Sequence, residues 1–262
     1  MSQIIQVIGV EILKARRAKM PLITLLAFSL VPFAAGFFMV VLRDPDKARS
    51  MGMISAKAQI VAGVADWPTF LGVLYQATAI GGVILFSFVC SWVFGREYAD
   101  RTISDLLALP TPRSYIVLAK FILVLLWSAM LMVIIYLIGL GVGAAINLPL
   151  GSTEVFFQGT ITLAITAVLT MALATPIAFF ASAGHGYLAP MGFAVFAVIL
   201  AQIITVTGWG EYFPWSIPAL YAGVAGPAYA DLGMVSFAIL IITSLLGILG
   251  TLAWWEFADQ TY

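Results

Sequence analysis

Charged side chains gather in one short segment, Phe94–Lys120, between two long apolar runs. Its ten residues from Arg96 to Asp105 include three acids and two arginines. Three pairs in it are four residues apart: Arg96 with Asp100, Glu97 with Arg101, and Arg101 with Asp105. Each such pair stabilises a helix by about 0.2–0.5 kcal/mol. We therefore predict a short helix in water over residues 95–109, ended by Pro110-Thr111-Pro112. A solvated connector is the alternative, because charge runs are usually solvated faces.

The chain contains few residues suited to catalysis or metal binding. Cys90 is its only cysteine and lies in an apolar run, and His185 is its only histidine and lies between two glycines. One histidine without a cysteine or carboxylate cluster does not make a metal site. No glycine-rich loop ends in Gly-Lys-Ser or Gly-Lys-Thr, so the chain has no P-loop for ATP. We expect neither a cofactor in this chain nor an enzymatic activity of its own.

The composition indicates an integral membrane protein. Hydrophobic residues make up 63% of the 262 residues, charged residues 9%, and the mean hydropathy is +1.09. Soluble domains carry about 25% charged residues, so a soluble fold has no means of burying this much apolar surface. Twelve basic and twelve acidic residues cancel. Nothing in this balance indicates a nucleic-acid partner.

The apolar runs predict an all-α fold with one transmembrane domain over residues 1–262. Residues 2–19 place Ile4, Ile8 and Ile12 on one helical face and Lys14 and Arg17 on the other, which is typical of an interfacial helix. Six runs are long enough to cross about 30 Å of hydrocarbon. We place these spans at about 20–42, 69–94, 115–146, 155–183, 187–207 and 232–255, with a kink at Pro176.

Basic residues set the predicted orientation. Four precede the first span and four lie within the charged segment, so both groups lie on one side, which is cytoplasmic by the positive-inside rule. Both termini are then cytoplasmic. The opposing loop, residues 43–68, also holds four basic residues. Residues 208–231 are rich in aromatics and proline, which predicts a re-entrant or interfacial hairpin or, alternatively, an ordinary aromatic-belt loop.

Charges are absent from the deep parts of the predicted spans. Gln76 is polar, but a single amide more often joins helices than binds a substrate. Intramembrane charges usually mark proton relays and coupling-ion sites. A secondary transporter or channel, or a membrane-embedded enzyme, would need such a pathway or a reactive cluster, so both remain only as alternatives.

The charged segment resembles a known family. Phe94-Gly95-Arg96-Glu97-Tyr98, Arg101-Thr102, Asp105 to Pro110, Arg113 and Ala119-Lys120-Phe121 are similar to permease subunits of type-two ABC exporters, most of all the bacitracin-resistance and lantibiotic-immunity permeases. Residues 213–220 resemble the loop between the last two spans of that family. The resemblance in layout covers the whole chain: an elbow helix and six spans in the bacterial cytoplasmic membrane, with both termini on the cytoplasmic side.

The resemblance implies a half-transporter. Two permeases, identical or paralogous, would pair in the bilayer above two separate ATPase subunits that hold ATP and Mg. Residues 95–109 would be the coupling helix that fits the ATPase. The residues that match this role are Gly95, Arg96, Glu97, Tyr98, Arg101, Thr102, Asp105, Leu106, Leu107, Pro110 and Arg113.

Family and composition also suggest the cargo. An apolar cleft between spans would suit an amphipathic antibiotic peptide, a drug or a lipid moved outward. Since solvated charges contribute little to stability, we expect Glu97→Lys to impair coupling more than folding.

Overall fold

Helices form all the regular structure of the described part of the chain. The computed structural model describes residues 3–44, 64–226 and 232–258. Within these ranges, six helical segments are long and apolar enough to cross a membrane. They are α2 (Met20–Arg43), α5 (Trp67–Ala99), α7 (Arg113–Ala145), α8 with α9 (Thr153–Ala172 and Thr175–Ala183), α10 (Leu188–Val206) and α12 (Met234–Phe257). The predicted all-α fold with six spans is confirmed. Most limits lie within two residues of the predicted ones, but α5 extends beyond the predicted limit at 94 to Ala99.

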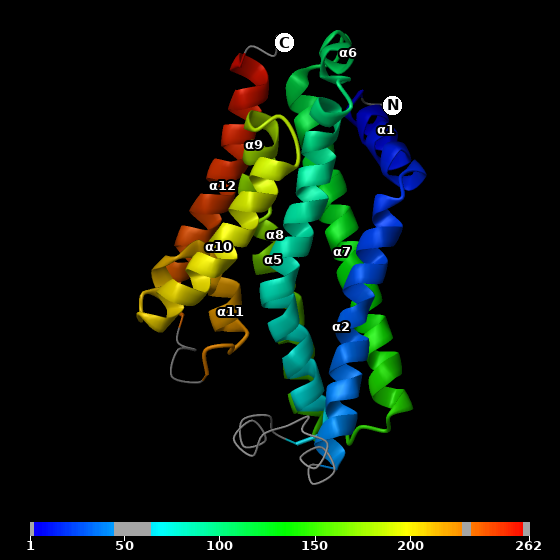
Figure 1. Cartoon of the computed structure of the whole chain (residues 1–262), viewed down its shortest axis with the longest axis vertical. Coiled ribbons are helices and arrows are strands. Elements are labelled where there is room, and N and C mark those ends of the chain that lie inside the picture. Colours follow the sequence, from blue (N-terminus) through cyan, green and yellow to red (C-terminus); the bar gives the residue numbers. More distant parts are fainter. Residues whose placement is uncertain (1–2, 45–63, 227–231, 259–262) are drawn as a thin grey trace.

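The long helices run side by side, and two short helices lie at one end of them. Figure 1 shows α1 (Gln3–Arg17) and α6 (Ile103–Leu107) at the end of the bundle where α12 also finishes. Helix α1 packs against α7 and touches the start of α2. The opposite end of the bundle carries the start of α5, where Trp67 N donates to Pro149 O at 3.2 Å. The loop predicted at residues 43–68 lies mostly outside the described residues.

The fourth span is interrupted near the predicted kink. Helix α8 ends at Ala172 and α9 begins at Thr175, directly before Pro176, whose ring removes a backbone donor. The carbonyl of Ala172 instead accepts from Ser244 Oγ at 3.0 Å and from Thr175 Oγ1 at 2.8 Å. Gly247 of α12 lies so close that a Cβ there would meet Pro176 Cα at 2.7 Å. Helix α12 is therefore fixed against the break by hydrogen bonds and by close approach.

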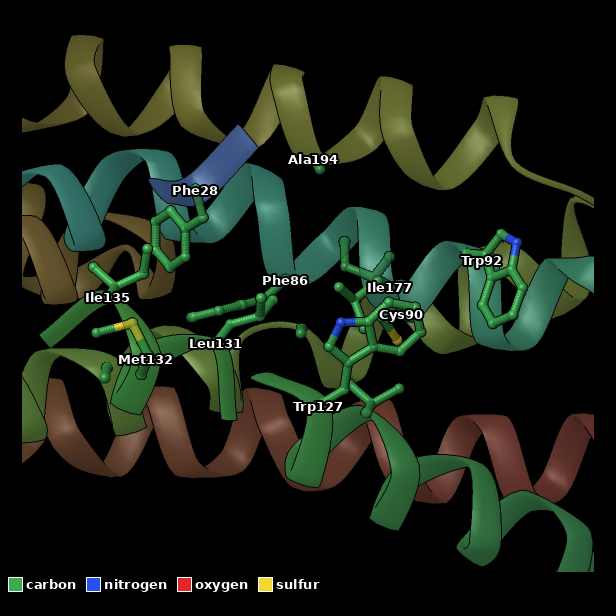
Figure 2. Close-up of a cluster of buried hydrophobic side chains, with 14 of the residues drawn as sticks. Phe28, Phe86, Cys90, Trp92, Trp127, Leu131, Met132, Ile135, Ile177 and Ala194 are labelled. Atoms are coloured by element: carbon green, nitrogen blue, oxygen red, sulfur yellow. The ribbon is translucent and has the colours of Figure 1, made fainter. Parts of the chain in front are cut away.

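A core of buried apolar side chains joins the helices. Figure 2 shows side chains of α2, α5, α7, α9 and α10 converging in a cluster of buried residues. Edge-to-face pairs join Phe28 to Phe86 at 5.9 Å and Trp92 to Trp127 at 5.6 Å between ring centroids. The outer surface is also apolar: Leu30 of α2, for example, is 67% exposed. Such an exposed face suits hydrocarbon rather than water.

The segment between α10 and α12 folds into short helical turns. These are η1 (Gly210–Tyr212), η2 (Pro214–Ser216) and α11 (Ile217–Tyr221). In Figure 1, α11 lies level with the side of α5 rather than beyond its lower end, and α11 contacts both α8 and α5. Ser216, Ile217 and Leu220 are buried there. Residues 227–231 lie outside the described ranges, and the re-entrant hairpin stays a prediction.

Candidate functional site

The charged segment forms two helices instead of one. Residues Gly95–Ala99 continue α5, and α6 is a separate turn of helix. Between them Arg101 adopts the left-handed conformation, with φ at +57°. Asp100 N donates to Arg96 O and Thr102 N to Glu97 O, each at 2.8 Å. The prediction of one helix over 95–109 is therefore wrong, because this hydrogen-bonded turn ends α5 and redirects the chain.

The turn and α6 present a charged surface. Arg101, Thr102 and Asp105 are exposed, as is Pro110 beyond the helix. Ile103, 2% exposed, anchors α6 in the core, and Leu106 and Leu107 pack partly against the core. Among the described residues, no ion pair joins Arg101 to Glu97 or Asp105. The exposed charges of Arg101 and Asp105 are thus available to a partner in water.

Glu97, in contrast, points into the protein and is only 4% exposed. Its Oε1 lies 2.8 Å from Lys120 Nζ and 3.1 Å from Lys14 Nζ. Glu11 completes the group, since its Oε2 lies 3.2 Å from Lys120 Nζ and its Oε1 lies 2.7 Å from Lys14 Nζ. We call these four residues the charge cluster. It joins α1, α5 and α7, so the expectation of a solvated Glu97 is wrong.

The composition of the charge cluster explains why it can be buried. Two carboxylates and two ammonium groups cancel, and Lys120, which is fully buried, also donates to Val93 O at 2.9 Å. Buried charges persist in proteins when they are paired and hydrogen-bonded in this way. Burial lowers the pKa of Lys14, but the carboxylates of Glu11 and Glu97 outweigh that effect and raise it overall. Lys14 therefore stays cationic at neutral pH, although we predicted it on the solvated face of its helix.

Arg96 shows the predicted local pairing. Its Nε lies 3.3 Å from Asp100 Oδ2, and its guanidinium lies 5.1 Å from the centroid of Trp92. This is a partly exposed pair, so it contributes little to stability. The pair lies at the C-terminal end of α5, directly before the exposed turn at Arg101.

Three further predicted residues fasten the end of α5 and the start of α7 to the rest of the bundle. At Gly95, a Cβ would meet Gly186 O at 2.8 Å, so α5 touches the turn before α10. The Tyr98 ring lies 5.1 Å from the His185 ring and 6.2 Å from that of Trp255. Arg113 Nη1 donates to Trp255 O at 3.0 Å, near the C-terminus of α12, where a cation is favoured.

The predicted site residues thus divide into an exposed group and a buried, fastened group. Glu11 was not predicted as a partner, and Lys120 entered the predictions only as a basic residue for the orientation and as part of the family resemblance. A lysine inside an apolar helix must find a counter-charge, and this signal could have linked Lys120 to an acid. Among the described residues, no group of three or more histidines, cysteines or acids is suited to hold a metal ion. The exposed charged surface is thus connected to α1, α5 and α7 through buried ion pairs.

Comparison with known proteins identifies the family. Residues 7–201 match the model of the "ABC-2 family transporter protein" family, which is more than half of the chain. The chain is 27% identical over 179 residues to the "Bacitracin transport permease protein BCRB" of Bacillus licheniformis, covering 68% of this chain and 85% of that protein. The exposed turn and α6, the charge cluster and five of the six candidate spans begin within the matched region. This chain is therefore a multi-pass membrane protein that belongs to the ABC-2 transporter family.

Proposed function

We propose that this permease moves an amphipathic antibiotic peptide, a drug or a lipid outward, using ATP hydrolysed by a separate subunit. The charged surface of the turn and α6 is the main observation that supports this, because it is exposed yet attached to the buried end of α5. The similar protein named as a bacitracin transport permease favours an antibiotic as cargo. Two ATPase subunits, holding ATP and Mg, would bind beneath two permeases, identical or paralogous, with both termini in the cytoplasm.

Force would pass from the exposed turn into the membrane through short, stiff connections. Movement of α6 acts on α5 through the turn at Arg101, which backbone hydrogen bonds close. The charge cluster then joins α5 to α1 and α7, and α1 leads directly into α2. A push on α6 would therefore shift α1, α5 and α7 together rather than bend one helix end.

A co-purification experiment tests this proposal. The chain is co-expressed with a candidate ABC ATPase of the same organism, and Arg101→Glu is combined with Asp105→Lys. Because this double variant reverses both charges at the contact, it should lower the yield of bound ATPase and the rate of ATP-dependent export by about tenfold or more. Glu154→Lys, an exposed change at the opposite end of the bundle, should leave both unchanged. Normal association and export in the double variant would reject the coupling surface.

A secondary transporter remains the alternative, and the charge cluster is the observation that favours it. Lys120 and Glu97 are buried inside candidate spans, as proton-relay residues often are. Both carboxylates of the cluster, however, are already paired with lysines near one end of the bundle. Reconstituted vesicles decide between the two: transport that follows a proton gradient without ATP would establish the alternative.

A further inference from the structure

A groove between α1 and α7 has the form of a lipid site. It has a volume of about 380 Å³ and lies between the end of α1, Pro21 at the start of α2, and the α7 face that carries Leu123, Leu126 and Met130. Its floor is formed by buried residues, Ala15 and Trp127. Trp127 is held in place because its Nε1 donates to Thr24 Oγ1 at 3.2 Å. Leu126 and Met130 are about half exposed, so the groove opens towards the membrane.

Positive charge lies at the mouth of this groove. Arg16 lines it, and Arg17 and Lys19 follow within three residues. All three are exposed, and none forms an ion pair with another described residue. In the same helix, Lys14 is neutralised by Glu11 and Glu97 within the charge cluster. The groove thus combines an apolar channel with one cation in its lining, Arg16, that forms no ion pair with another described residue.

We infer that this groove holds one anionic glycerophospholipid of the leaflet in which α1 lies. Its phosphate would bind the Arg16 guanidinium, whose planar donors match phosphate oxygens. One acyl chain would lie along Leu123, Leu126 and Met130. Arg17 and Lys19 add attraction for an anionic leaflet without lining the groove. The site goes beyond the proposed transport activity, because it is a structural lipid site on the chain itself and needs neither ATPase nor cargo.

The charge cluster beneath α1 makes the groove a preformed site. Glu11 and Lys14 fix α1 to α5 and α7 on the face next to Ala15. The distance between α1 and α7, and hence the width of the groove, is therefore set by the protein before any lipid binds. Binding to a preformed site costs less free energy, because fewer protein groups have to be ordered. A lipid in such a site is therefore expected to stay bound during purification.

Native mass spectrometry of the purified full chain tests the inference. Dioleoyl phosphatidylglycerol and dioleoyl phosphatidylcholine are titrated separately into the detergent-solubilised protein. One phosphatidylglycerol should remain bound per chain, and Arg16→Gln should weaken it by about tenfold, as expected for loss of a charge-assisted hydrogen bond. The matched control Arg17→Gln removes the same charge one residue away and should weaken it by less than half as much on a logarithmic scale.

A second pair of variants tests the acyl channel without changing any charge. Met130→Trp should fill the groove and abolish the retained lipid. Val133→Trp should not, because Val133 lies on the same helix with similar exposure but outside the groove. Equal losses for Arg16→Gln and Arg17→Gln would overturn the site in favour of general surface attraction. Equal binding of the two lipids would also overturn it. Disulfide cross-linking of Met130→Cys between two copies would show instead that a second chain covers the groove.

Discussion

At the scale of single residues, Lys120 is the buried charge on which most contacts converge. It touches Glu97, Glu11 and the carbonyl of Val93, and it is fully buried. Removing one partner of a buried ion pair leaves an uncompensated charge. We expected Glu97→Lys to impair coupling more than folding, and the burial of Glu97 reverses that expectation. The variant would place three ammonium groups around one buried carboxylate, so it should destabilise the fold.

Lys120→Met should lower the free energy of unfolding by about 3 kcal/mol, because it leaves the cluster with a net negative charge. Thermal unfolding of the detergent-solubilised protein measures this as a lower Tm. The double variant Lys120→Met with Glu97→Gln leaves a neutral Glu11–Lys14 pair and should recover part of the loss. Arg101→Met, an exposed change of similar size, serves as the control. A Tm for Lys120→Met equal to that of Arg101→Met would contradict a stabilising cluster.

This cluster also marks the limit of what the sequence could predict at the residue scale. The pair of Arg96 with Asp100 follows from spacing alone, and it is present. The partners of Glu97 lie 83 and 23 residues away in the chain. No local rule connects residues at such separations, because their contact depends on how α1 and α7 pack against α5. Local pairs are too weak to decide which way a helix end turns.

At the scale of elements, α5 depends on a close approach at Gly95. Gly95→Ala should lower the free energy of unfolding by about 1–3 kcal/mol, since its Cβ would meet the backbone of Gly186 and force a shift. Gly81→Ala in the same helix is the matched control, because nothing lies within 4 Å of its Cβ. That change should be neutral or stabilising by up to about 1 kcal/mol. Thermal unfolding distinguishes them, and equal Tm values would argue against the contact.

The elements themselves were predictable because hydrocarbon imposes their length. Each apolar run had to cross the same thickness, and so the limits of α2 and α12 fall close to the predicted ones. The end of α5 was less predictable, since Phe94 marks where the charges begin rather than where the helix stops. Gly95, Glu97 and Tyr98 remain helical because they bury their contacts against other elements. The charge of Glu97 thus led us to expect a solvated residue, whereas in the fold Lys14 and Lys120 neutralise it.

At the scale of the whole molecule, the proposed orientation can be tested with cysteines. Cys90 is fully buried, so a membrane-impermeant maleimide should not label the parent chain. Asp105→Cys and Glu154→Cys place exposed thiols at opposite ends of the bundle. With α1 and α6 in the cytoplasm, intact cells should show labelling of Glu154→Cys alone, and permeabilised cells should show labelling of both.

The labelling pattern tests the proposed mechanism, because the α6 surface can bind an ATPase only if it faces the cytoplasm. Four basic residues in the predicted outer loop weaken the positive-inside signal. Cysteine labelling tests the orientation without relying on the distribution of basic residues. Labelling of Asp105→Cys in intact cells would place α6 outside and remove the proposed energy input, even if the family and fold stand. Labelling of Glu154→Cys alone would instead leave the turn at Arg101 as a cytoplasmic surface, joined through Glu97 and Lys120 to three helices that a bound ATPase could move together.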